Sequence, residues 1–449
     1  MSFADMLGFE NSTNIFASAP EAQFLDHAWQ DKASITRIDQ LAAVLGDKLP
    51  PSVLQEIREA SQKVGMSIRI TPYILALVDW KHIETDPIRR QFLPMLSELE
   101  DDHPCLAIDS LDERSTSPAP NLVHRYPDKV LFLVTSVCPV YCQYCTRSYA
   151  VGQATPSLKK ENVSSASGWS AALDYIRSNP CVEDVVVSGG DIARLKPQNI
   201  RMLGNALLDI EHVRRIRLAT KALSVQPMRF LSDEEWFSAI AEIARKGRSM
   251  FKSVFIHTHI NTPREITPLV KRAMQRIFSE GIHVRNQAVL LRGINDDSQT
   301  LIDLARKLGR VNIQPYYVYA CDMVKNTEHF RVPISEMQRL EREVRGATAG
   351  FNTPLFIVDA PGGGGKRDVH SYEYRNEEYG ITGYRAPAVD PDRMYFYFDP
   401  LRSLDRKPVQ LGATPALGSR FSPSCHGQER KQERLNDVQS RLPSPQLRT

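Results

Sequence analysis

The sequence predicts an α/β protein built on a partial (βα)6 barrel, with a helical region before the barrel and an extension after it. From residue 129 onward, short β-rich segments alternate with amphipathic helical segments at roughly 30-residue spacing, which is typical of parallel βα units. About six such units fit before residue 366. Polar residues follow several of the expected strands, and barrels of this kind carry their chemistry at the carboxyl ends of the strands.

The region before the barrel, residues 1–120, is expected to be helical. Helix-like apolar spacing occurs in Ile38–Leu45, Pro51–Val64 and Asp86–Leu99. The segment Ser115–Asn121, rich in Ser, Thr and Pro, is expected to be a linker.

The barrel core is expected over residues 121–366. The expected strands are Lys129–Thr135, Val182–Val187, Ile216–Ala219, Ser253–His257, His283–Leu290, Asn312–Tyr317 and Leu355–Val358. The expected helices between them are Ser170–Ser178, Gln198–Glu211, Ser232–Lys246, Arg264–Glu280, Thr300–Leu308 and Ile334–Val344. Residues 367–404 form the expected C-terminal extension. Residues 405–449 have few large apolar side chains and are expected to be a disordered tail.

Composition and charge exclude several classes of protein. Hydrophobic residues make up 42% of the chain and charged residues 24%, as in ordinary globular proteins. The net charge of +3 is too small to indicate a nucleic-acid partner. No apolar run approaches the ~18 residues that cross a bilayer, and the N-terminus lacks a secretory pattern. Seven cysteines, three of them grouped as metal ligands would be, favour the reducing cytoplasm.

The most informative pattern is C-x₃-C-x₂-C, formed by Cys138, Cys142 and Cys145 directly after the apolar segment 130–134. Three thiolates can hold three irons of a cubane cluster, whereas electron-transfer clusters usually use four cysteines. One iron then stays open for a ligand that is not protein. Tyr144, beside the third cysteine, could lie flat against a bound purine.

Two other interpretations of this cysteine pattern remain open. A structural zinc site would need further ligands at short spacing. The remaining cysteines are scattered singly, at Cys105, Cys181, Cys321 and Cys425. The three cysteines could also be a coincidental buried group.

A second pattern is Asp359-Ala-Pro-Gly-Gly-Gly-Gly-Lys366. A nucleotide-binding P-loop needs Gly before the spacer and Ser or Thr after the lysine, but Ala360 and Arg367 stand there. The segment is either a flexible linker or a loop that lets the backbone approach a flat ligand. In the second case Lys366 can form a Schiff base with an aldehyde cofactor such as pyridoxal phosphate.

Further polar residues follow the expected strands and are predicted to meet at one rim. They are Gly189, Gly190 and Asp191 after the second strand, His257 and His259 at the fourth, Gln287 in the fifth, Asp322 after the sixth and Asp359 at the last.

Together these motifs resemble the lysine 2,3-aminomutase family of radical S-adenosylmethionine enzymes. The resemblance runs from His124 to Lys366 and includes the segments His-Arg-Tyr-Pro-Asp-Lys (124–129), Leu-Leu-Arg-Gly-Ile-Asn-Asp (290–296) and Cys-Asp…Glu-His-Phe-Arg (321–331). It implies the radical S-adenosylmethionine partial barrel and isomerase activity.

The resemblance also implies cofactors. Cys138, Cys142 and Cys145 would bind a [4Fe–4S] cluster whose open iron chelates S-adenosyl-L-methionine. Further contacts to this molecule would come from Gly189, Gly190, Asp191, His259 and Gln287. Lys366 would hold pyridoxal 5′-phosphate, with Arg125 and Lys129 at its phosphate.

The substrate follows from three other positions. By resemblance, Arg147 would clamp the substrate carboxylate, while Asp322 and Asp359 would grip a distal ammonium. Two carboxylates that face one site repel each other unless a cation lies between them. The substrate is therefore expected to be a small cationic amino acid: lysine, with arginine or ornithine as alternatives. The competing interpretation is that both aspartates are ordinary strand-end caps.

The chain departs from the family pattern in two places. Residues 219–229 read Ala-Thr-Lys-Ala-Leu-Ser-Val-Gln-Pro-Met-Arg, with Lys221 where better-known members carry arginine. The cysteine cluster that binds zinc near the C-terminus of type members is reduced to Cys425, so zinc is not expected.

The resemblance further implies a homo-oligomer and an external reductant such as flavodoxin or ferredoxin. Two other functions remain open. One is a relative that modifies lysine destined for a translation factor. The other is a non-catalytic iron–sulfur protein for electron transfer or sensing, which would not need Lys366, Asp322 or Asp359.

Overall fold

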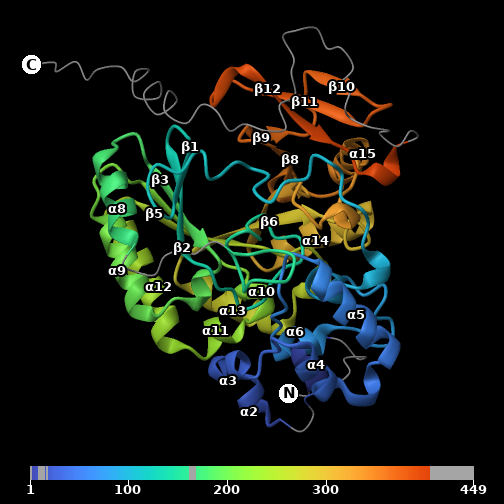
Figure 1. Cartoon of the computed structure of the whole chain (residues 1–449). Helices are drawn as coiled ribbons and strands as arrows, with labels where there is room; N and C mark the ends of the chain where they lie inside the picture. The colour runs from blue at the N-terminus through green and yellow to red at the C-terminus, as the bar shows by residue number, and fades with distance from the viewer. Residues whose placement is uncertain (1–2, 9–15, 17–18, 161–167, 405–449) are drawn as a thin grey trace, which may run out of the picture. The chain divides into compact units, whose positions relative to one another are not determined.

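A nine-stranded sheet in the order β1-β2-β3-β4-β5-β6-β7-β8-β9 organises the computed structural model, which describes residues 3–8, 16, 19–160 and 168–404 (Figure 1). The strands are β1 (Leu122–Tyr126), β2 (Lys129–Thr135), β3 (Asp184–Gly189), β4 (Arg215–Ala219), β5 (Ser253–Thr258), β6 (His283–Leu290), β7 (Ile313–Ala320), β8 (Leu355–Ala360) and β9 (Gly365–Asp368). The tail predicted over 405–449 lies outside the described residues.

The strands β2 to β8 are parallel to their neighbours, whereas β1 and β9 run antiparallel at the two edges. Since β1 and β9 stand at opposite ends of the strand order, the described sheet is an open barrel. This confirms the predicted α/β partial barrel. All seven predicted strands are present, with ends displaced by a few residues.

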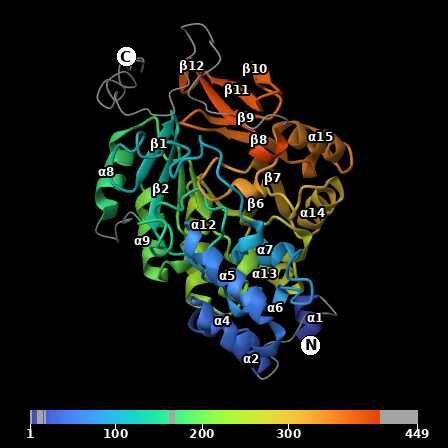
Figure 2. The same ribbon diagram turned by 45° about the vertical axis from the view of Figure 1, so that its right-hand side comes forward.

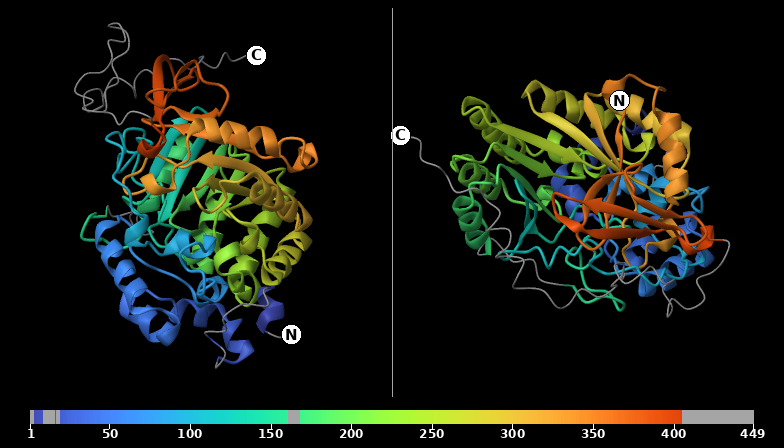
Figure 3. Two further views of the ribbon diagram at one scale, coloured as in Figure 1. Left: turned by 90° about the vertical axis from the view of Figure 1, so that its right-hand side faces the viewer. Right: turned by 90° about the horizontal axis from the view of Figure 1, so that it is seen from above.

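Helices cover the outer face of the curved sheet (Figure 3). They are α8 (Trp169–Ser178), α9 (Pro197–Leu208), α12 (Glu234–Ser249), α13 (Pro268–Ser279), α14 (Ser298–Arg310) and α15 (Ile334–Val344), with the short α10 (Ala222–Val225) and α11 (Met228–Leu231) after β4. Each long helix buries one stripe; in α12, Trp236, Ile240 and Ile243 pack into the main core. The six predicted helices are confirmed. The one predicted from Arg264 begins at Pro268, where the Thr267 side chain accepts the Val270 amide.

The N-terminal region is helical, as predicted. It holds α1 (Phe3–Leu7), α2 (Glu21–Phe24), α3 (His27–Lys32), α4 (Ile38–Leu45), α5 (Pro51–Lys63), α6 (Pro72–Leu77) and α7 (Pro87–Phe92). The single helix predicted over Asp86–Leu99 is wrong. It ends at Phe92, because Pro94 disfavours helical backbone at Leu93, and a separate 3₁₀ turn spans Leu96–Glu98. These helices lie together at the bottom of the view in Figure 2. Their buried apolar side chains form most of a second core.

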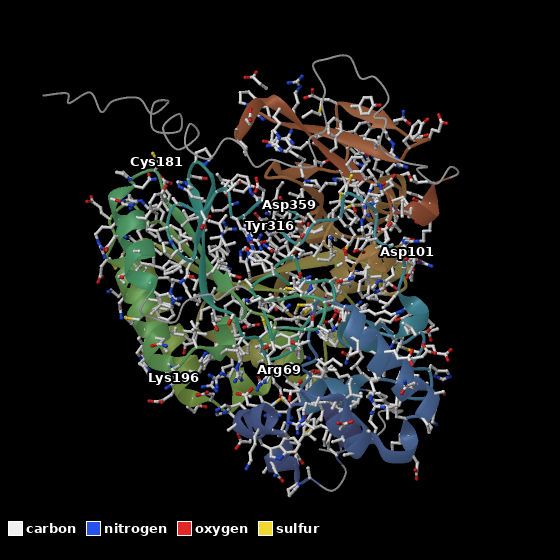
Figure 4. All side chains as sticks on the ribbon, viewed as in Figure 1. Arg69, Asp101, Cys181, Lys196, Tyr316 and Asp359 are labelled. Carbon is white, nitrogen blue, oxygen red and sulfur yellow. The ribbon has the colours of Figure 1, made fainter. Side chains whose placement is uncertain are left out.

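The N-terminal region packs at the carboxyl ends of the strands. Cys181, just before β3, and Lys196, just after it, lie at opposite ends of the sheet, and Arg69 of the N-terminal region lies at the Lys196 end (Figure 4). Beyond β9, the strands β10 (Tyr374–Asn376), β11 (Ile381–Ala386) and β12 (Asp390–Phe398) form a separate antiparallel sheet. Within the described ranges, no helix is long and apolar enough to span a bilayer.

Candidate active site

The cysteine loop, residues 136–152, leaves the carboxyl end of β2 and is tied at its base by the Gly152 amide, which donates to the Ser136 carbonyl at 3.0 Å. The N-terminal region anchors its middle. The Tyr141 amide donates to the Arg69 carbonyl at 3.0 Å, and the Gln143 amide donates to the Gln91 carbonyl at 2.9 Å. The loop therefore depends on two regions that are far apart in sequence.

Cys138, Cys142 and Cys145 are half-buried free thiols on this loop. Burial raises the pKa of all three, and that of Cys142 to about 12, which Lys221 opposes. In the part of the chain that the structure describes, no three His, Cys, Asp or Glu side chains converge on one point as single-ion ligands. A cubane places one thiolate on each iron, so its ligands need not converge in this way.

Gly189 and Gly190 lie against the backbone of the cysteine loop. A Cβ at Gly190 would stand 2.5 Å from the Val137 carbonyl oxygen and 2.7 Å from the Val137 nitrogen. Gly189, with φ of +108°, would place a Cβ 2.4 Å from the Thr135 carbonyl oxygen. The glycine pair is therefore required for the approach of β3 to the cysteine loop.

Asp191 is 3% exposed, and both of its oxygens are engaged within the protein. Oδ1 accepts from the Thr220 hydroxyl at 2.6 Å and from the Ala193 amide at 2.8 Å, while Oδ2 accepts from the Lys221 amide at 2.7 Å. The side chain fastens the end of β3 to the end of β4.

His259 and Tyr144 belong to a buried polar network. His259 Nδ1 lies 2.6 Å from the Gln287 carbonyl oxygen, which can only accept, so the proton of the neutral ring is on Nδ1. Burial, followed by Lys221, lowers the His259 pKa to about 3. Nε2 is then an acceptor for the Tyr144 hydroxyl at 2.8 Å. The Tyr144 ring packs with an apolar group that includes Phe330.

The altered segment 219–229 follows β4 and carries a buried ion pair. Lys221 Nζ donates to Glu265 Oε2 at 2.9 Å and to the His259 carbonyl at 2.9 Å. Glu265 is fully buried, and its Oε1 accepts from two backbone amides and from Gln91. Lys221 also lies 5.7 Å from the centroid of the Phe92 ring.

A second group of interacting side chains consists of Lys366, Asp359 and Arg125. Asp359 Oδ2 accepts from Lys366 Nζ at 3.0 Å, and Oδ1 accepts from Arg125 Nη1 at 3.0 Å. Burial opposes ionisation of Asp359, but Lys366 and Arg125 outweigh it and lower the pKa of the carboxyl. Burial likewise disfavours the Lys366 ammonium, but Asp359 outweighs it and holds the pKa of Lys366 well above its usual value. In this state Asp359 is neutralised by side chains of the chain itself.

The glycine segment before Lys366 is the ordered turn between β8 and β9, in which Ala360 pairs with Gly365. Gly365 has a φ of +75°, and a Cβ there would stand 2.7 Å from the Tyr126 hydroxyl. That hydroxyl accepts the Lys366 amide at 2.8 Å. The absence of a side chain at Gly365 thus lets Tyr126 fix the backbone of Lys366.

Asp322 follows β7 and is half-buried beside this group. Its Oδ2 accepts from the Thr146 hydroxyl at 2.5 Å. Burial, followed by repulsion from Asp359, raises the pKa of Asp322 to about 7. The two predicted aspartates are therefore neighbours; among the described residues, cations are bonded to Asp359 but not to Asp322.

Arg147 and Glu113 form a bidentate pair, with Nε and Nη2 of Arg147 at 3.0 and 2.7 Å from the two oxygens of Glu113. Glu113 lies in residues 107–117, here called the strap, which crosses the site. The Gly362 amide donates to the Ser110 carbonyl of the strap at 2.8 Å, and Arg125 Nη2 donates to the Leu111 carbonyl at 3.0 Å.

A cationic group lines the interior of the barrel near Lys129. It consists of Lys129, Arg217 and Arg285, which surround His257 and all lower its pKa, after the larger effect of burial. His257 Nδ1 contacts Gln287 Nε2 at 3.0 Å, whereas its buried Nε2 has no hydrogen-bond partner within the described ranges. Burial, followed by Lys366, lowers the pKa of Lys129 to about 7. Tyr316, whose ring lies 5.8 Å from that of His257, and Asp359 lie inside the curve of the sheet (Figure 4).

The predicted rim thus contains two groups of polar residues, one around the three cysteines and one around Lys366. The hydrogen bond from Thr146 of the cysteine loop to Asp322 joins them. Sequence reasoning missed Glu113, Thr146, Tyr126, Arg217 and Arg285, whereas Lys129 and His257 of the cationic group were named. For Tyr126 a signal was present, since it lies in the segment 124–129 that carries part of the resemblance. Glu113 had none, because it stands in an acidic, irregular stretch of the N-terminal region.

Three known proteins that are similar to this chain in sequence are all named 2,3-aminomutases. The chain is 35% identical over 384 residues to an L-lysine 2,3-aminomutase from Clostridium subterminale, covering 83% of this chain and 87% of that protein. It is 33% identical over 413 residues to an L-lysine 2,3-aminomutase from Bacillus subtilis, covering 89% and 83%. It is 34% identical over 348 residues to a glutamate 2,3-aminomutase from Clostridioides difficile, covering 77% and 76%.

Two further comparisons are less informative. No protein-family model matches the chain. Among solved structures, the chain is similar to Streptococcus suis SuiB, with a TM-score of 0.38 and 14% identity over 52% of this chain and 50% of that one. It is also similar to a radical SAM methyltransferase from Sphaerobacter thermophilus, with a TM-score of 0.36 and 15% identity over 80% and 95%.

Proposed function

The chain belongs to the lysine 2,3-aminomutase family, and from this premise we propose that it is an isomerase that moves the amino group of L-lysine from C2 to C3, giving L-β-lysine. The observation that carries the proposal is the pair Asp322 and Asp359 beside Lys366, with Arg147 nearby on the cysteine loop. A substrate with a carboxylate at one end and an ammonium at the other is complementary to such a charge distribution.

The cysteine loop supports a [4Fe–4S] cluster. Its three thiols are free and share one loop, so they would hold three of the irons and would leave the fourth for an external ligand such as S-adenosyl-L-methionine. Gly189 and Gly190 hold β3 against this loop, while Asp191 and His259 stiffen the adjacent strand ends. Asp191 and His259 therefore act on S-adenosylmethionine by positioning backbone around it, since their own polar atoms are already bonded.

The interior of the barrel supports pyridoxal 5′-phosphate on Lys366. Lys129 and Arg285, with the unpartnered Nε2 of His257, suit a phosphate, whereas Arg217 is already paired with Asp184 at 2.7 Å. Arg125 is occupied by Asp359, so its part is to hold that carboxylate rather than the phosphate. When bound, the cluster with S-adenosylmethionine supplies the radical that removes hydrogen, and pyridoxal phosphate supplies the π-system through which nitrogen migrates.

Asp359 changes partners in this proposal. Without the cofactor, the Lys366 ammonium occupies Asp359 Oδ2 at 3.0 Å. A Lys366 nitrogen bonded to the cofactor would no longer be a free ammonium beside Asp359, which would leave Asp359 Oδ2 open to another cation. The distal ammonium of lysine would occupy that position. Cofactor loading and recognition of a cationic substrate are therefore coupled through Asp359.

The charges of Asp322 and Asp359 also rank the alternative substrates. Arginine and ornithine also carry a distal cation and remain the nearest competitors. Glutamate, the substrate in the name of one relative, would bring a third carboxylate to Asp322 and Asp359. An iron–sulfur electron carrier would not need the ion pair at Lys366.

The remaining parts of the proposal follow from the family. The enzyme takes an electron from an external reductant such as flavodoxin or ferredoxin, works in the cytoplasm and assembles as a homo-oligomer. No zinc is proposed.

The deciding experiment is mass spectrometry of anaerobic reactions that contain reconstituted protein, S-adenosylmethionine, pyridoxal phosphate and dithionite, with lysine, arginine, ornithine and glutamate tested separately. We expect β-lysine and 5′-deoxyadenosine with lysine only. The Cys142→Ala variant is the control and should yield neither. If 5′-deoxyadenosine forms while lysine stays unchanged, the radical chemistry stands and the substrate assignment fails.

A further inference from the structure

Glu113, which belongs to no sequence motif identified above, is the most completely engaged carboxylate near the proposed substrate site. It is 3% exposed. Oε1 accepts from Arg147 Nη2 at 2.7 Å, and Oε2 accepts from Arg147 Nε at 3.0 Å and from the Tyr149 hydroxyl at 2.8 Å. A bidentate contact of this kind fixes the plane of the guanidinium as well as its position.

The contact uses only one edge of Arg147. Nε and Nη2 face Glu113, and Nη1 has no hydrogen-bond partner among the residues that the structure describes. The Arg147 side chain keeps 22% of its surface exposed, whereas Glu113 is covered. A planar guanidinium held along one edge presents its other donors in a fixed direction.

Glu113 is itself held in place from two directions. Its amide donates to Asp109 Oδ1 at 3.0 Å within the strap, and the strap is bonded to the turn before Lys366 through the Ser110 carbonyl. The pair therefore connects the cysteine loop, which carries Arg147, with the turn that precedes Lys366. A flexible arginine on a loop would otherwise lose side-chain entropy on binding a ligand.

We propose that Glu113 is a positioning residue that aims the free edge of Arg147 at the α-carboxylate of the substrate and so sets the preference for a free amino acid. This inference rests on the proposed function. Glu113 touches neither substrate nor cofactor in this role; it acts through Arg147.

The test compares lysine with lysinamide, which lacks the α-carboxylate but keeps both amino groups. Binding is measured with the protein loaded with pyridoxal phosphate, from the change in cofactor absorbance as each amine is added, without S-adenosylmethionine or reductant. In the unmodified protein we expect lysine to bind at least about tenfold more tightly than lysinamide. Glu113→Gln, which cannot accept both guanidinium bonds, should weaken lysine binding about tenfold and change lysinamide binding less than about twofold.

Tyr149→Phe is the matched control, because it removes one hydrogen bond to Glu113 but keeps both contacts with Arg147. It should preserve the discrimination. Iron content, cofactor absorbance and thermal midpoint show whether the Glu113→Gln variant is folded and loaded with cofactors. If it is not, Glu113→Asp, which keeps the charge, takes its place. That variant should also lose lysine binding more than lysinamide binding, but to a smaller degree. Equal weakening of lysine and lysinamide binding would overturn the positioning role.

This result separates the inference from the proposed function. Failure of the unmodified protein to form β-lysine would count against the function. Normal β-lysine formation with undiminished discrimination in Glu113→Gln would count against the inference alone.

Discussion

Asp322 and Asp359 are chemically identical residues whose surroundings shift their pKa values in opposite directions. Asp359 is bonded to two cations and stays ionised, whereas Asp322 has a hydroxyl as its bonded partner and a carboxylate as its neighbour. Asp322 is therefore a group at this site whose charge changes near neutral pH, as is Lys129, whose pKa burial and Lys366 lower to about 7.

The first prediction concerns pH. The pKa of Asp322 is raised from 3.8 to about 7, so below that pH the carboxyl is neutral and cannot attract an ammonium. Lysine affinity of the cofactor-loaded protein should fall by up to about tenfold per pH unit below pH 7. Binding curves recorded by cofactor absorbance at about pH 6 and about pH 8 give the slope. Asp322→Asn should bind weakly at both values; a slope that survives in this variant would remove Asp322 as its source.

The same shift has a consequence for stability in the absence of substrate. A carboxyl whose folded-state pKa is raised contributes stability that is present below its unfolded pKa and is lost as the pH rises through the folded value. For Asp322 that window lies between 3.8 and about 7. Bound lysine, by pairing with the carboxylate, should offset this loss.

At the residue scale, the sequence predicts which residues belong to the site better than it predicts which residues they contact. The cysteines and Lys366 were identified by their spacing and glycine context. The partners of Arg147 and Arg125 were not, because each lies far along the chain: Glu113 is 34 residues from Arg147, and Asp359 is 234 residues from Arg125. Such pairs are set by tertiary distances, which no local pattern encodes. Whether the predicted residues hold the cofactors stays a prediction.

At the scale of elements, the approach of β3 to the cysteine loop requires that Gly189 and Gly190 carry no side chain. The second prediction is therefore that Gly190→Ala displaces the loop, since the new Cβ would meet Val137 backbone atoms at 2.5 and 2.7 Å. After reconstitution, iron per chain should fall to less than about half that of the unmodified protein. Gly350→Ala is the control, because nothing lies within 4 Å of its Cβ. Full iron content in Gly190→Ala would show that the loop can move without losing the cluster.

The βα units were predictable because hydrophobic periodicity changes between strands and helices, and the six barrel helices and seven parallel strands were found in this way. The failures have local causes. Asp86–Leu99 has helical spacing, but Pro94 breaks it. The edge strand β1, with half-buried His124, Arg125 and Tyr126, lacks a clear apolar pattern. The short strands β9 and β10 lie in polar sequence, where periodicity carries little signal. The end of β12 does alternate, with buried Tyr395 and Tyr397, and this signal was overlooked.

At the scale of the whole molecule, the N-terminal helices and the barrel meet around Lys221 and Glu265. Gln91 and Phe92 of the N-terminal region touch this pair, and the pair links the ends of β4 and β5. The segment 219–229, which departs from the family pattern, therefore contributes to the packing of the N-terminal helices against the barrel.

The third prediction follows from the burial of that pair. Lys221→Met leaves Glu265 charged and buried without a cation, which should lower the free energy of unfolding by about 3–5 kcal/mol. The thermal midpoint measures the loss. Adding Glu265→Gln to the same chain should recover part of it, because the uncompensated charge is then gone. Arg177→Met, which breaks an exposed pair with Asp174, is the control and should leave the midpoint unchanged. An unchanged midpoint in Lys221→Met would mean that Glu265 takes up a proton at little cost.

The open edge of the barrel has a mechanical consequence. The first strand reaches the last two through side chains rather than through a backbone ladder: Arg125 of β1 bonds to Asp359 of β8, and Tyr126 of β1 bonds to Lys366 of β9. These are the same two residues that would carry substrate and cofactor. The contact of β1 with β8 and β9 is therefore held by the same residues that would bind substrate and cofactor. A change of partner at Asp359 or Lys366 during turnover should also change how firmly β1 is held against the rest of the barrel. Local opening of β1, measured by amide hydrogen exchange, should then change when the cofactor or the substrate binds and when it is released.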